Sequence, residues 1–182
     1  MALTTYIALL RAVNLGDQNR VSMADLRAML EGLGYSNART LLASGNLVFT
    51  GKEMEVSALE RRLEGEAARR LGLRTPIIVR TLPEVSEALA HNPFPRESEQ
   101  DPAHVVVVFL RDEPSEAGWA SLRAAATGPE VVRGWGRHAY VYYAAGIGNS
   151  RLTGAVVDRK LGTVGTGRNW STVTKIAAAA SG

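Results

Sequence analysis

The sequence predicts an α+β protein made of two ferredoxin-like (βαββαβ) modules in tandem, with antiparallel sheets and helices packed on one face. Three observations lead to this prediction. Short apolar runs and amphipathic segments follow the order βαββαβ over residues 5–80, a proline-rich and charged break covers residues 92–102, and the same order restarts at residue 104. We therefore place the modules at residues 1–81 and 104–182, with a connecting helix and linker at 82–103.

Hydrophobic periodicity defines the elements of the first module. Residues 5–10 form an apolar run that predicts a buried strand. Residues 23–33 repeat apolar side chains at helical spacing, and Ser22 with Asp25 three positions later is typical of a helix start. The other predicted elements are a hairpin at 39–49, a helix at 56–71 and a strand at 75–80.

The second module repeats this order after a short helix at residues 82–91. We interpret the charged residues 96–102 as a linker because a Pro-Phe-Pro break precedes them. The predicted elements are a strand at 104–110, a helix at 115–126, strands at 130–135 and 138–144, a helix at 151–161, a strand at 163–167 and a helix at 171–180. The two halves show no residue-level repeat, so we infer an architectural duplication.

Composition limits the possible classes of protein. Of 182 residues, 46% are hydrophobic and 21% charged, which is ordinary for a globular protein. The absence of cysteine excludes disulfides, thiolate catalysis and cysteine-ligated zinc. No apolar run approaches the roughly 18 residues that a membrane-spanning helix needs, and the N-terminus lacks a signal-peptide pattern. We expect a soluble, cytoplasmic protein without a membrane partner, and its oligomeric state stays open.

The net charge of +3 is unevenly distributed, because residues 145–182 carry five basic side chains and one acidic. This local excess suits an anionic ligand but is small for a surface that binds duplex nucleic acid. The alternative is a basic face that is simply solvated.

Two polar segments in the first module are candidates for binding. The loop at residues 11–20 contains Arg11, Asn14, Asn19 and Arg20, side chains that hold anions or amides through several donors. Alternatively, the asparagines bond the loop backbone to itself and the arginines are solvated. The second segment, at 43–46, offers Ser44 and Asn46. Ordinary hairpin chemistry also explains it.

Two further candidate segments lie near the C-terminus. At residues 144–152, glycines lead from a strand into a helix expected near Ser150, and Arg151 adds a positive charge that suits phosphate or carboxylate. A glycine-bearing turn is the plain alternative. At 165–176, the candidates are Arg168, Asn169, Trp170 and Lys175. A capped and anchored C-terminal helix explains these residues equally well.

Several catalytic patterns are missing from the chain. His91, His104 and His138 are the only histidines, and none has the spacing of a metal ligand. Serine-nucleophile, zinc-protease and paired-carboxylate motifs are also absent. We therefore expect no cofactor and no metal.

Three sequence segments together resemble a known family. The strings YIALLRAVNLGDQNRVSMADLRAML, ASGNLVF and GTGRNWSTVTKI are similar to the bacterial family named domain of unknown function 1697. The resemblance extends from about residue 5 to residue 176. It implies two ferredoxin-like halves and no particular activity. It also implies that relatives carry asparagine where this chain has Ser171 and lysine where it has Arg151.

These observations favour a cytoplasmic protein that binds an anionic small molecule, or a nucleic-acid fragment, in a cleft between the modules. One alternative is a metal-independent enzyme acting on a phosphorylated substrate, with Ser44, Ser150 or Asp17 as nucleophile or base. Another is a homo-oligomeric interaction protein without a small ligand.

Overall fold

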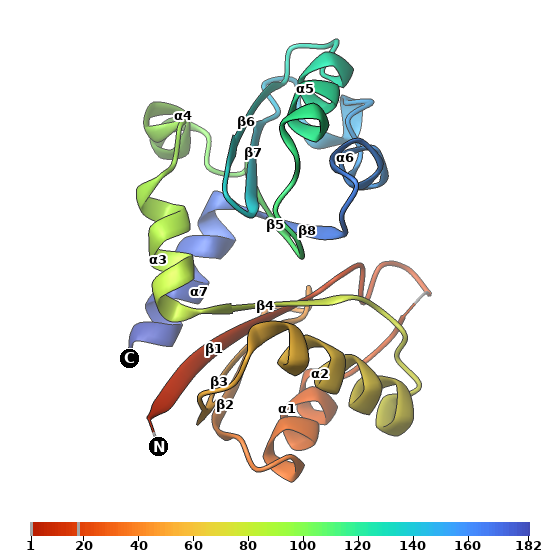
Figure 1. Cartoon of the computed structure of the whole chain (residues 1–182), viewed down its shortest axis with the longest axis vertical. Coiled ribbons are helices and arrows are strands. Elements are labelled where there is room, and N and C mark those ends of the chain that lie inside the picture. Colours follow the sequence, from red (N-terminus) through yellow and green to blue (C-terminus); the bar gives the residue numbers. More distant parts are fainter. Residues whose placement is uncertain (1, 18) are drawn as a thin grey trace. The chain divides into compact units, whose positions relative to one another are not determined.

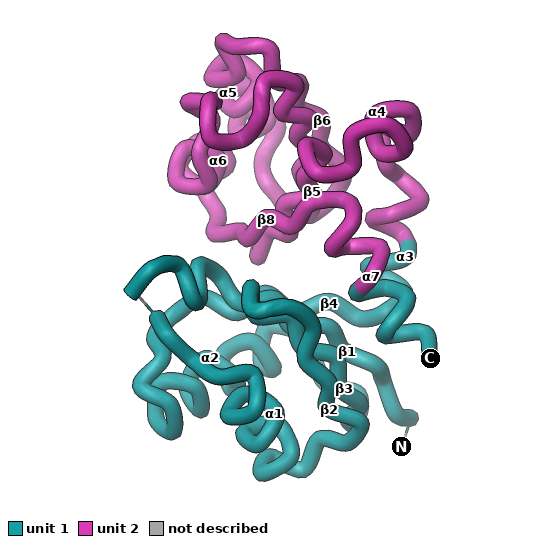
Figure 2. Tube along the Cα trace, turned by 180° about the vertical axis from the view of Figure 1, so that it is seen from behind, with its two compact units in different colours: residues 1–86, 176–182 teal, residues 87–175 magenta. Residues whose placement is uncertain are grey.

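The computed structural model describes residues 2–17 and 19–182 of the chain. It forms two compact units, each with a four-stranded antiparallel sheet (Figures 1 and 2). Unit 1 comprises Met1–Ser86 and Ile176–Gly182, and unit 2 comprises Glu87–Lys175. The predicted mixed α+β class is therefore confirmed. Within the described residues, no helix is long and apolar enough to cross a membrane.

Unit 1 contains the first sheet, whose strand order is β2-β3-β1-β4. Its elements are β1 (Leu3–Leu10), α1 (Met23–Gly32), β2 (Ser36–Leu41), β3 (Asn46–Lys52), α2 (Val56–Leu71), β4 (Ile77–Thr81) and the start of α3 (Leu82–Ala90). The predicted hairpin, both helices and the fourth strand of this module are confirmed.

Helices α1 and α2 cover one face of this sheet (Figure 1). Alternate residues of β1, namely Tyr6, Ala8 and Leu10, belong to the same buried cluster as Leu26 of α1 and Leu63 of α2. The period of two along a strand accounts for this alternation. The helix ends follow the sequence signals, because Ser22 accepts a hydrogen bond from the Asp25 N–H group (3.0 Å) and Gly72 closes α2 in the left-handed conformation.

Unit 2 contains the second sheet, of order β6-β7-β5-β8. Its elements are α4 (Pro95–Gln100), β5 (Val105–Leu110), α5 (Glu116–Ala125), β6 (Val131–Trp135), β7 (His138–Tyr142), the 3-10 turn η1 (Ile147–Asn149), α6 (Gly154–Leu161), β8 (Gly165–Asn169) and most of α7 (Trp170–Ser181). Helices α5 and α6 cover one face of this sheet (Figure 1).

Two of the element predictions in the second half are wrong. The supposed linker at residues 96–102 contains helix α4, which begins at Pro95, since proline suits the first position of a helix. The helix expected to start near Ser150 begins instead at Gly154. Its cap is Thr153, whose hydroxyl accepts a hydrogen bond from Val156 N–H (3.4 Å).

The two sheets match in the positions of their hydrogen bonds and strand pairs, as well as in strand order. The Leu10 N–H group donates to the carbonyl of Gly45 (2.9 Å), and Leu110 N–H donates to that of Arg137 (2.9 Å). In the same way Arg80 of β4 pairs with Ile7 and Arg168 of β8 pairs with Val107, three residues before the end of the first strand in each unit. The duplication therefore extends to residue positions.

Candidate functional site

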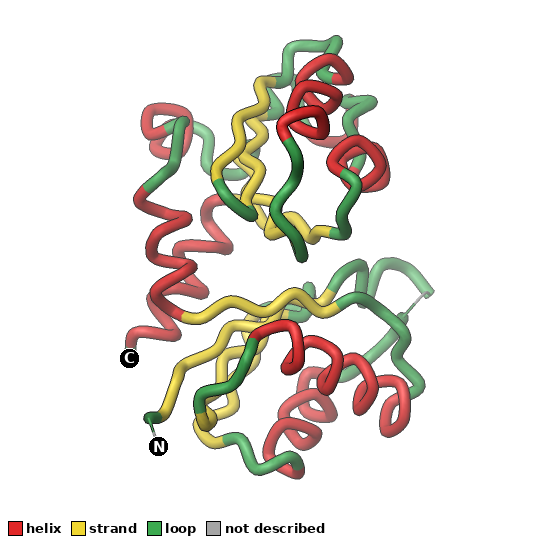
Figure 3. Tube along the Cα trace, in the orientation of Figure 1, coloured by secondary structure: helices red, strands yellow, loops and turns green. Residues whose placement is uncertain are grey.

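The polar residues at positions 11–20 lie in the loop between β1 and α1 of unit 1 (Figure 3). Ala12, Asn14, Gly16 and Asn19 all have positive φ, a conformation that asparagine and glycine tolerate better than most residues. Asn14 donates through Nδ2 to the Ala43 carbonyl (2.9 Å) and accepts from Val21 N–H (2.9 Å). The loop is therefore held to the neighbouring hairpin by side-chain hydrogen bonds.

The other predicted residues of this loop have separate roles. Asn19 donates to the Ala12 carbonyl (3.3 Å) and so bonds the loop to itself, as the alternative interpretation expected, whereas the side chain of Asn14 bonds to Ala43 and Val21. Arg11 is half-buried, and its backbone N–H donates to the Pro76 carbonyl (3.0 Å). Arg20 is exposed and pairs with Asp17 (2.6 Å).

In the hairpin turn at residues 42–45, the polar side chains form the hydrogen bonds of an ordinary hairpin, which was the alternative to a binding role. Asn46 is fully buried and donates to the Leu41 carbonyl (2.8 Å) and to Ser44 Oγ (2.9 Å). Gly45 has φ +77°, and an added Cβ atom would lie 2.7 Å from a Val13 methyl group. Ser44 and Asn46 therefore stabilise a turn that packs closely against the first strand.

A cavity of about 810 Å³ lies beside the loop in unit 1. It is lined by Asn14, Gly16, Arg20, Val21, Ser22, Asp25, Arg70 and Leu71. The structure thus brings two predicted residues, Asn14 and Arg20, together with the start of α1 and the end of α2. Arg11, Asn19, Ser44 and Asn46 do not line this cavity.

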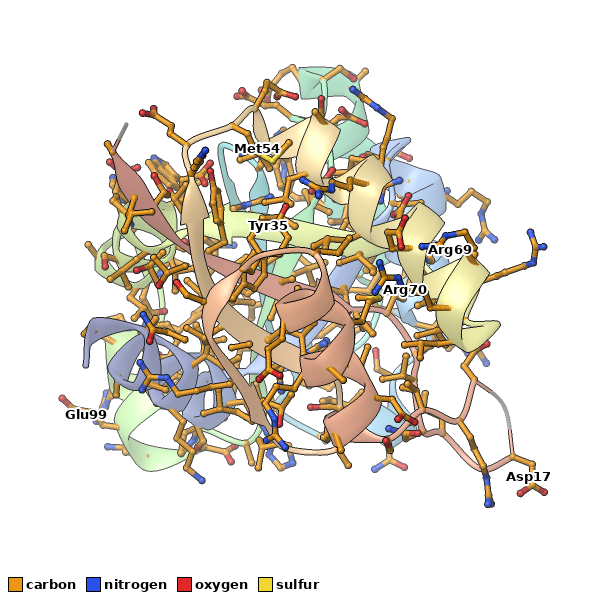
Figure 4. All side chains as sticks on the ribbon, turned by 90° about the horizontal axis from the view of Figure 1, so that it is seen from below. Asp17, Tyr35, Met54, Arg69, Arg70 and Glu99 are labelled. Atoms are coloured by element: carbon orange, nitrogen blue, oxygen red, sulfur yellow. The ribbon has the colours of Figure 1, made fainter. Side chains whose placement is uncertain are left out.

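Arg70 is the residue of this cavity that sequence reasoning missed. It leaves the last turn of α2 beside Arg69, whereas Asp17 projects away from the protein (Figure 4). Both arginines donate to the same oxygen of Glu66, each at 2.6 Å, and these hydrogen bonds lower the pKa of Glu66. Helical periodicity indicates which residues of α2 are exposed, but not that Arg70 lies beside the distant loop.

A smaller cavity of about 310 Å³ lies in unit 2 and contains two other predicted residues, Ser150 and Arg151. The remaining lining comes from Asn149 and residues 127–130. Ser150 Oγ accepts from Leu152 N–H (3.0 Å), and Arg151 is exposed. Because α6 begins only at Gly154, the predicted helix N-terminus next to Ser150 does not exist.

The C-terminal candidates are mostly structural. Asn169 Oδ1 accepts from the backbone N–H of Thr172 (2.9 Å) at the start of α7, and the backbone N–H of Trp170 donates to the Pro102 carbonyl (3.2 Å). Arg168 is buried and donates to Thr166 Oγ1 (2.7 Å) and the Gly167 carbonyl (2.9 Å). Burial lowers the pKa of Arg168, which nevertheless keeps its charge at neutral pH. Lys175 is exposed on α7.

No group of three or more histidine, cysteine or acidic residues that could hold a metal ion lies within the described residues 2–17 and 19–182. The convergence of loops from both modules on one cleft, which the sequence predicts, stays a prediction. The structure does provide a polar cavity in unit 1 and another in unit 2.

The chain is thus a small α+β protein whose two units have the same kind of four-stranded sheet, and a polar cavity lies in each unit. The chain belongs to the family described as "Protein of unknown function (DUF1697)", whose model matches residues 3–140. The conserved bacterial protein SP0830 from Streptococcus pneumoniae has a similar structure, with a TM-score of 0.76 and 24% identity over 98% of this chain and 99% of that one. That likeness shows the fold alone. No curated protein matches the chain.

Proposed function

We propose that this protein binds a small anionic ligand in the cavity of unit 1, which we call the Arg20–Arg70 cavity. The observation that carries the proposal is the meeting of two arginines from distant elements at one cavity of about 810 Å³. This volume falls within the roughly 300–1,000 Å³ that is usual for small-molecule sites.

The two arginines keep donors for a ligand. Arg20 uses Nε for the Gly16 carbonyl (3.3 Å) and one terminal nitrogen for Asp17, while Arg70 uses Nε for Glu66. A guanidinium has five N–H groups, so each side chain retains N–H groups that can bind a phosphate or carboxylate.

The start of α1 adds to this preference for anions. The first N–H groups of a helix have no acceptor within it and carry a partial positive charge. Ser22 accepts only from Asp25 N–H, which leaves the Met23 and Ala24 N–H groups at the helix start without an intrahelical partner. The hydrogen bonds of Asn14 support the loop around this opening, so a ligand meets a preformed surface.

Asp25 narrows the class of ligand. It lines the same cavity and would repel a highly charged anion, but its carboxylate accepts hydrogen bonds from hydroxyl groups. The arrangement therefore favours a phosphorylated or carboxylated molecule that also carries hydroxyl groups, such as a sugar phosphate.

Two finer statements accompany this proposal. We infer that each unit is a ferredoxin-like module, which the strand orders β2-β3-β1-β4 and β6-β7-β5-β8 support. We also infer that the protein acts in the cytoplasm, and the absence of cysteine supports this location.

Thermal-shift and calorimetric titrations test the proposed function. The panel contains inorganic phosphate, sugar phosphates, nucleotides, citrate, short oligonucleotides, and uncharged sugars and nucleosides. A ligand at 100 times its dissociation constant adds about 2.7 kcal/mol of stability, or about 5–10 °C in Tm for a protein of this size. We expect such a shift with a hydroxylated anion and none with its uncharged analogue.

Arg69 offers a matched control for Arg70. Both side chains pair with Glu66 from the same helical turn, but only Arg70 lines the cavity. We expect Arg70→Gln to weaken binding about tenfold or more, since hydrogen bonds to charged groups contribute about 1.5–3 kcal/mol, and Arg69→Gln to change it less than about twofold. Equal losses in the two variants, or no response to any anion, would reject the proposal.

A further inference from the structure

The smaller cavity, in unit 2, contains a carboxylate that the fold itself does not use. Glu130 lines this cavity next to Asn149, Ser150 and Arg151, and only 8% of Glu130 is exposed. Within residues 2–17 and 19–182, no group forms a hydrogen bond or an ion pair with its side chain. Its carboxylate oxygens therefore remain available as acceptors at the cavity, which points to a ligand that supplies a donor.

Gly128 makes room for this carboxylate. An added Cβ atom at Gly128 would lie 2.5 Å from Glu130 Oε2, although the backbone there does not have the positive φ that requires glycine. The absence of a side chain at Gly128 therefore leaves space for the Glu130 carboxylate, and the turn itself does not require glycine there.

The neighbouring tyrosine does not satisfy Glu130. The Tyr143 hydroxyl donates to the Leu152 carbonyl (2.8 Å), so its only hydrogen is already committed. Burial, together with the negative charge of Glu130, raises the pKa of Tyr143 to about 12. The carboxylate thus lies near a tyrosine that does not donate to it, and it lines the cavity.

Arg151 gives the cavity a second, opposite charge. Its side chain is exposed, lines the same cavity and forms no ion pair with Glu130. A bare metal cation fits poorly, because one carboxylate is too few for a hard cation and Arg151 would repel it. A molecule with both charges satisfies both residues.

We propose that the unit 2 cavity binds a small zwitterion, whose ammonium group is held by Glu130 and whose carboxylate or phosphate is held by Arg151. The volume of about 310 Å³ limits the ligand to the size of an amino acid or a phosphorylated amino alcohol. This site is separate from the Arg20–Arg70 cavity in its residues, in its unit and in the charge of its ligand.

The direct test uses the full chain, labelled with nitrogen-15 for NMR. The probes are 4-aminobutyrate and phosphoethanolamine, each compared with the singly charged butyrate and butylamine. We expect both zwitterions to shift the amide signals of residues 128–130 and 149–151, and the singly charged compounds to bind at least about tenfold more weakly. If neither zwitterion shifts these signals at millimolar concentrations, the proposal is wrong.

Two variants assign the charges, and two others serve as controls. Glu130→Gln should weaken zwitterion binding about tenfold or more, and Arg151→Gln should weaken it by a similar factor. Glu113→Gln, which removes an exposed carboxylate outside the cavity, is the control and should have no effect. Arg70→Gln should also have no effect, which distinguishes this proposal from the proposed function. Unchanged binding in Glu130→Gln would overturn the assignment.

The stability of the free protein provides a second, independent readout. Because no described group bonds to the Glu130 carboxylate, its replacement by the neutral amide in Glu130→Gln should not lower the Tm without ligand. A carboxylate that supports the fold would instead lower the Tm when it is replaced. A fall in Tm would therefore contradict a ligand-binding role for Glu130, whatever the choice of probes.

Discussion

Units 1 and 2 share the same sheet but differ in the loops that carry polar residues. Both have the strand order second-third-first-fourth, and in both the first strand ends at a leucine that an arginine follows, at Leu10-Arg11 and Leu110-Arg111. In unit 1 the following loop extends to Ser22, whereas in unit 2 the helix cap Ser115 comes only a few residues later. The comparison shows that the two sheets have the same strand order, whereas different loops line the two cavities. In unit 1 the loop between β1 and α1 contributes, and in unit 2 the segments 127–130 and 149–151 do.

The comparison also changes the interpretation of Arg168. Alone, a buried arginine in a polar segment is a natural candidate for anion binding. Arg80, however, occupies the equivalent position in unit 1, and its terminal nitrogen also donates to the preceding carbonyl, at 2.8 Å from Val79. Because Arg80 and Arg168 occupy equivalent positions and form the same local hydrogen bond, we interpret both as structural residues of the sheets.

The equivalent hairpin turns offer the largest predicted difference between the units. Gly45 and Gly136 both have positive φ, but an added Cβ at Gly45 would meet Val13 and Leu10 at 2.7 and 2.9 Å, whereas nothing lies within 4 Å at Gly136. We expect Gly45→Ala to cost about 3 kcal/mol, from backbone strain and overpacking together, and Gly136→Ala about 1 kcal/mol from strain alone. Urea unfolding of both variants measures these costs.

Tryptophan fluorescence can separate the two units in that experiment. All three tryptophans, Trp119, Trp135 and Trp170, lie in unit 2, whereas far-ultraviolet circular dichroism reports on both. Gly45→Ala should therefore affect the dichroism transition at least as much as the fluorescence transition. Equal costs for the two alanine variants would show that the close packing at Gly45 is absent.

Alkaline pH should destabilise unit 2 more than unit 1. Burial raises the pKa of Tyr140, and burial with the Glu130 charge raises that of Tyr143 to about 12. The folded state keeps these protons more tightly than the unfolded chain, so the stabilisation is complete below pH 10 and is lost as pH rises from 10 towards 12. Each tyrosine contributes a slope of up to about 1.4 kcal/mol per pH unit. Arg168, whose pKa burial lowers to about 10, contributes a slope of the opposite sign in this range, so the two tyrosines together outweigh it.

The contrast with unit 1 comes from Tyr35, whose pKa is also raised by burial but is pulled down by the nearby Arg62 cation. Urea unfolding between pH 8 and pH 11.5, followed by tryptophan fluorescence, measures the slope for unit 2. Tyr143→Phe should make this slope smaller above pH 10 and leave it unchanged below pH 9. A variant with the same slope as the natural chain would contradict this assignment.

Local signals in the sequence were sufficient for most of the fold. Ser22 and Gly72 mark helix ends because capping depends on residues within one turn. The prediction failed at residues 96–102, where high charge indicated a linker although Pro95 begins a helix. It also failed near Ser150, because Thr153 three residues later caps the helix instead. Both errors concern short segments in which several polar residues compete for the same role.

The sites were less predictable than the fold, because cavities join segments that are distant in sequence. Asn14 and Arg20 were visible as excess polarity in one loop, but Arg70 lies 50 positions further along, on a helix whose charged face looks ordinary. Glu130 had no signal at all, since a glutamate before a strand is common. Its significance comes from burial without a partner, a property that only three-dimensional packing reveals.

The smallest predicted effects on stability concern two exposed arginines, Arg20 at the cavity of unit 1 and Arg151 at the cavity of unit 2. Arg20 pairs with Asp17 at 2.6 Å, but the two side chains are 71% and 91% exposed, and such surface pairs contribute little. Arg151 is exposed and forms no ion pair within the described residues. We expect Arg20→Gln and Arg151→Gln to change the free energy of unfolding by less than about 0.5 kcal/mol each. Urea unfolding at low and high salt checks this. If either variant lost more, the arginine would support the fold of its unit, and reduced ligand binding by that variant could no longer be assigned to the cavity.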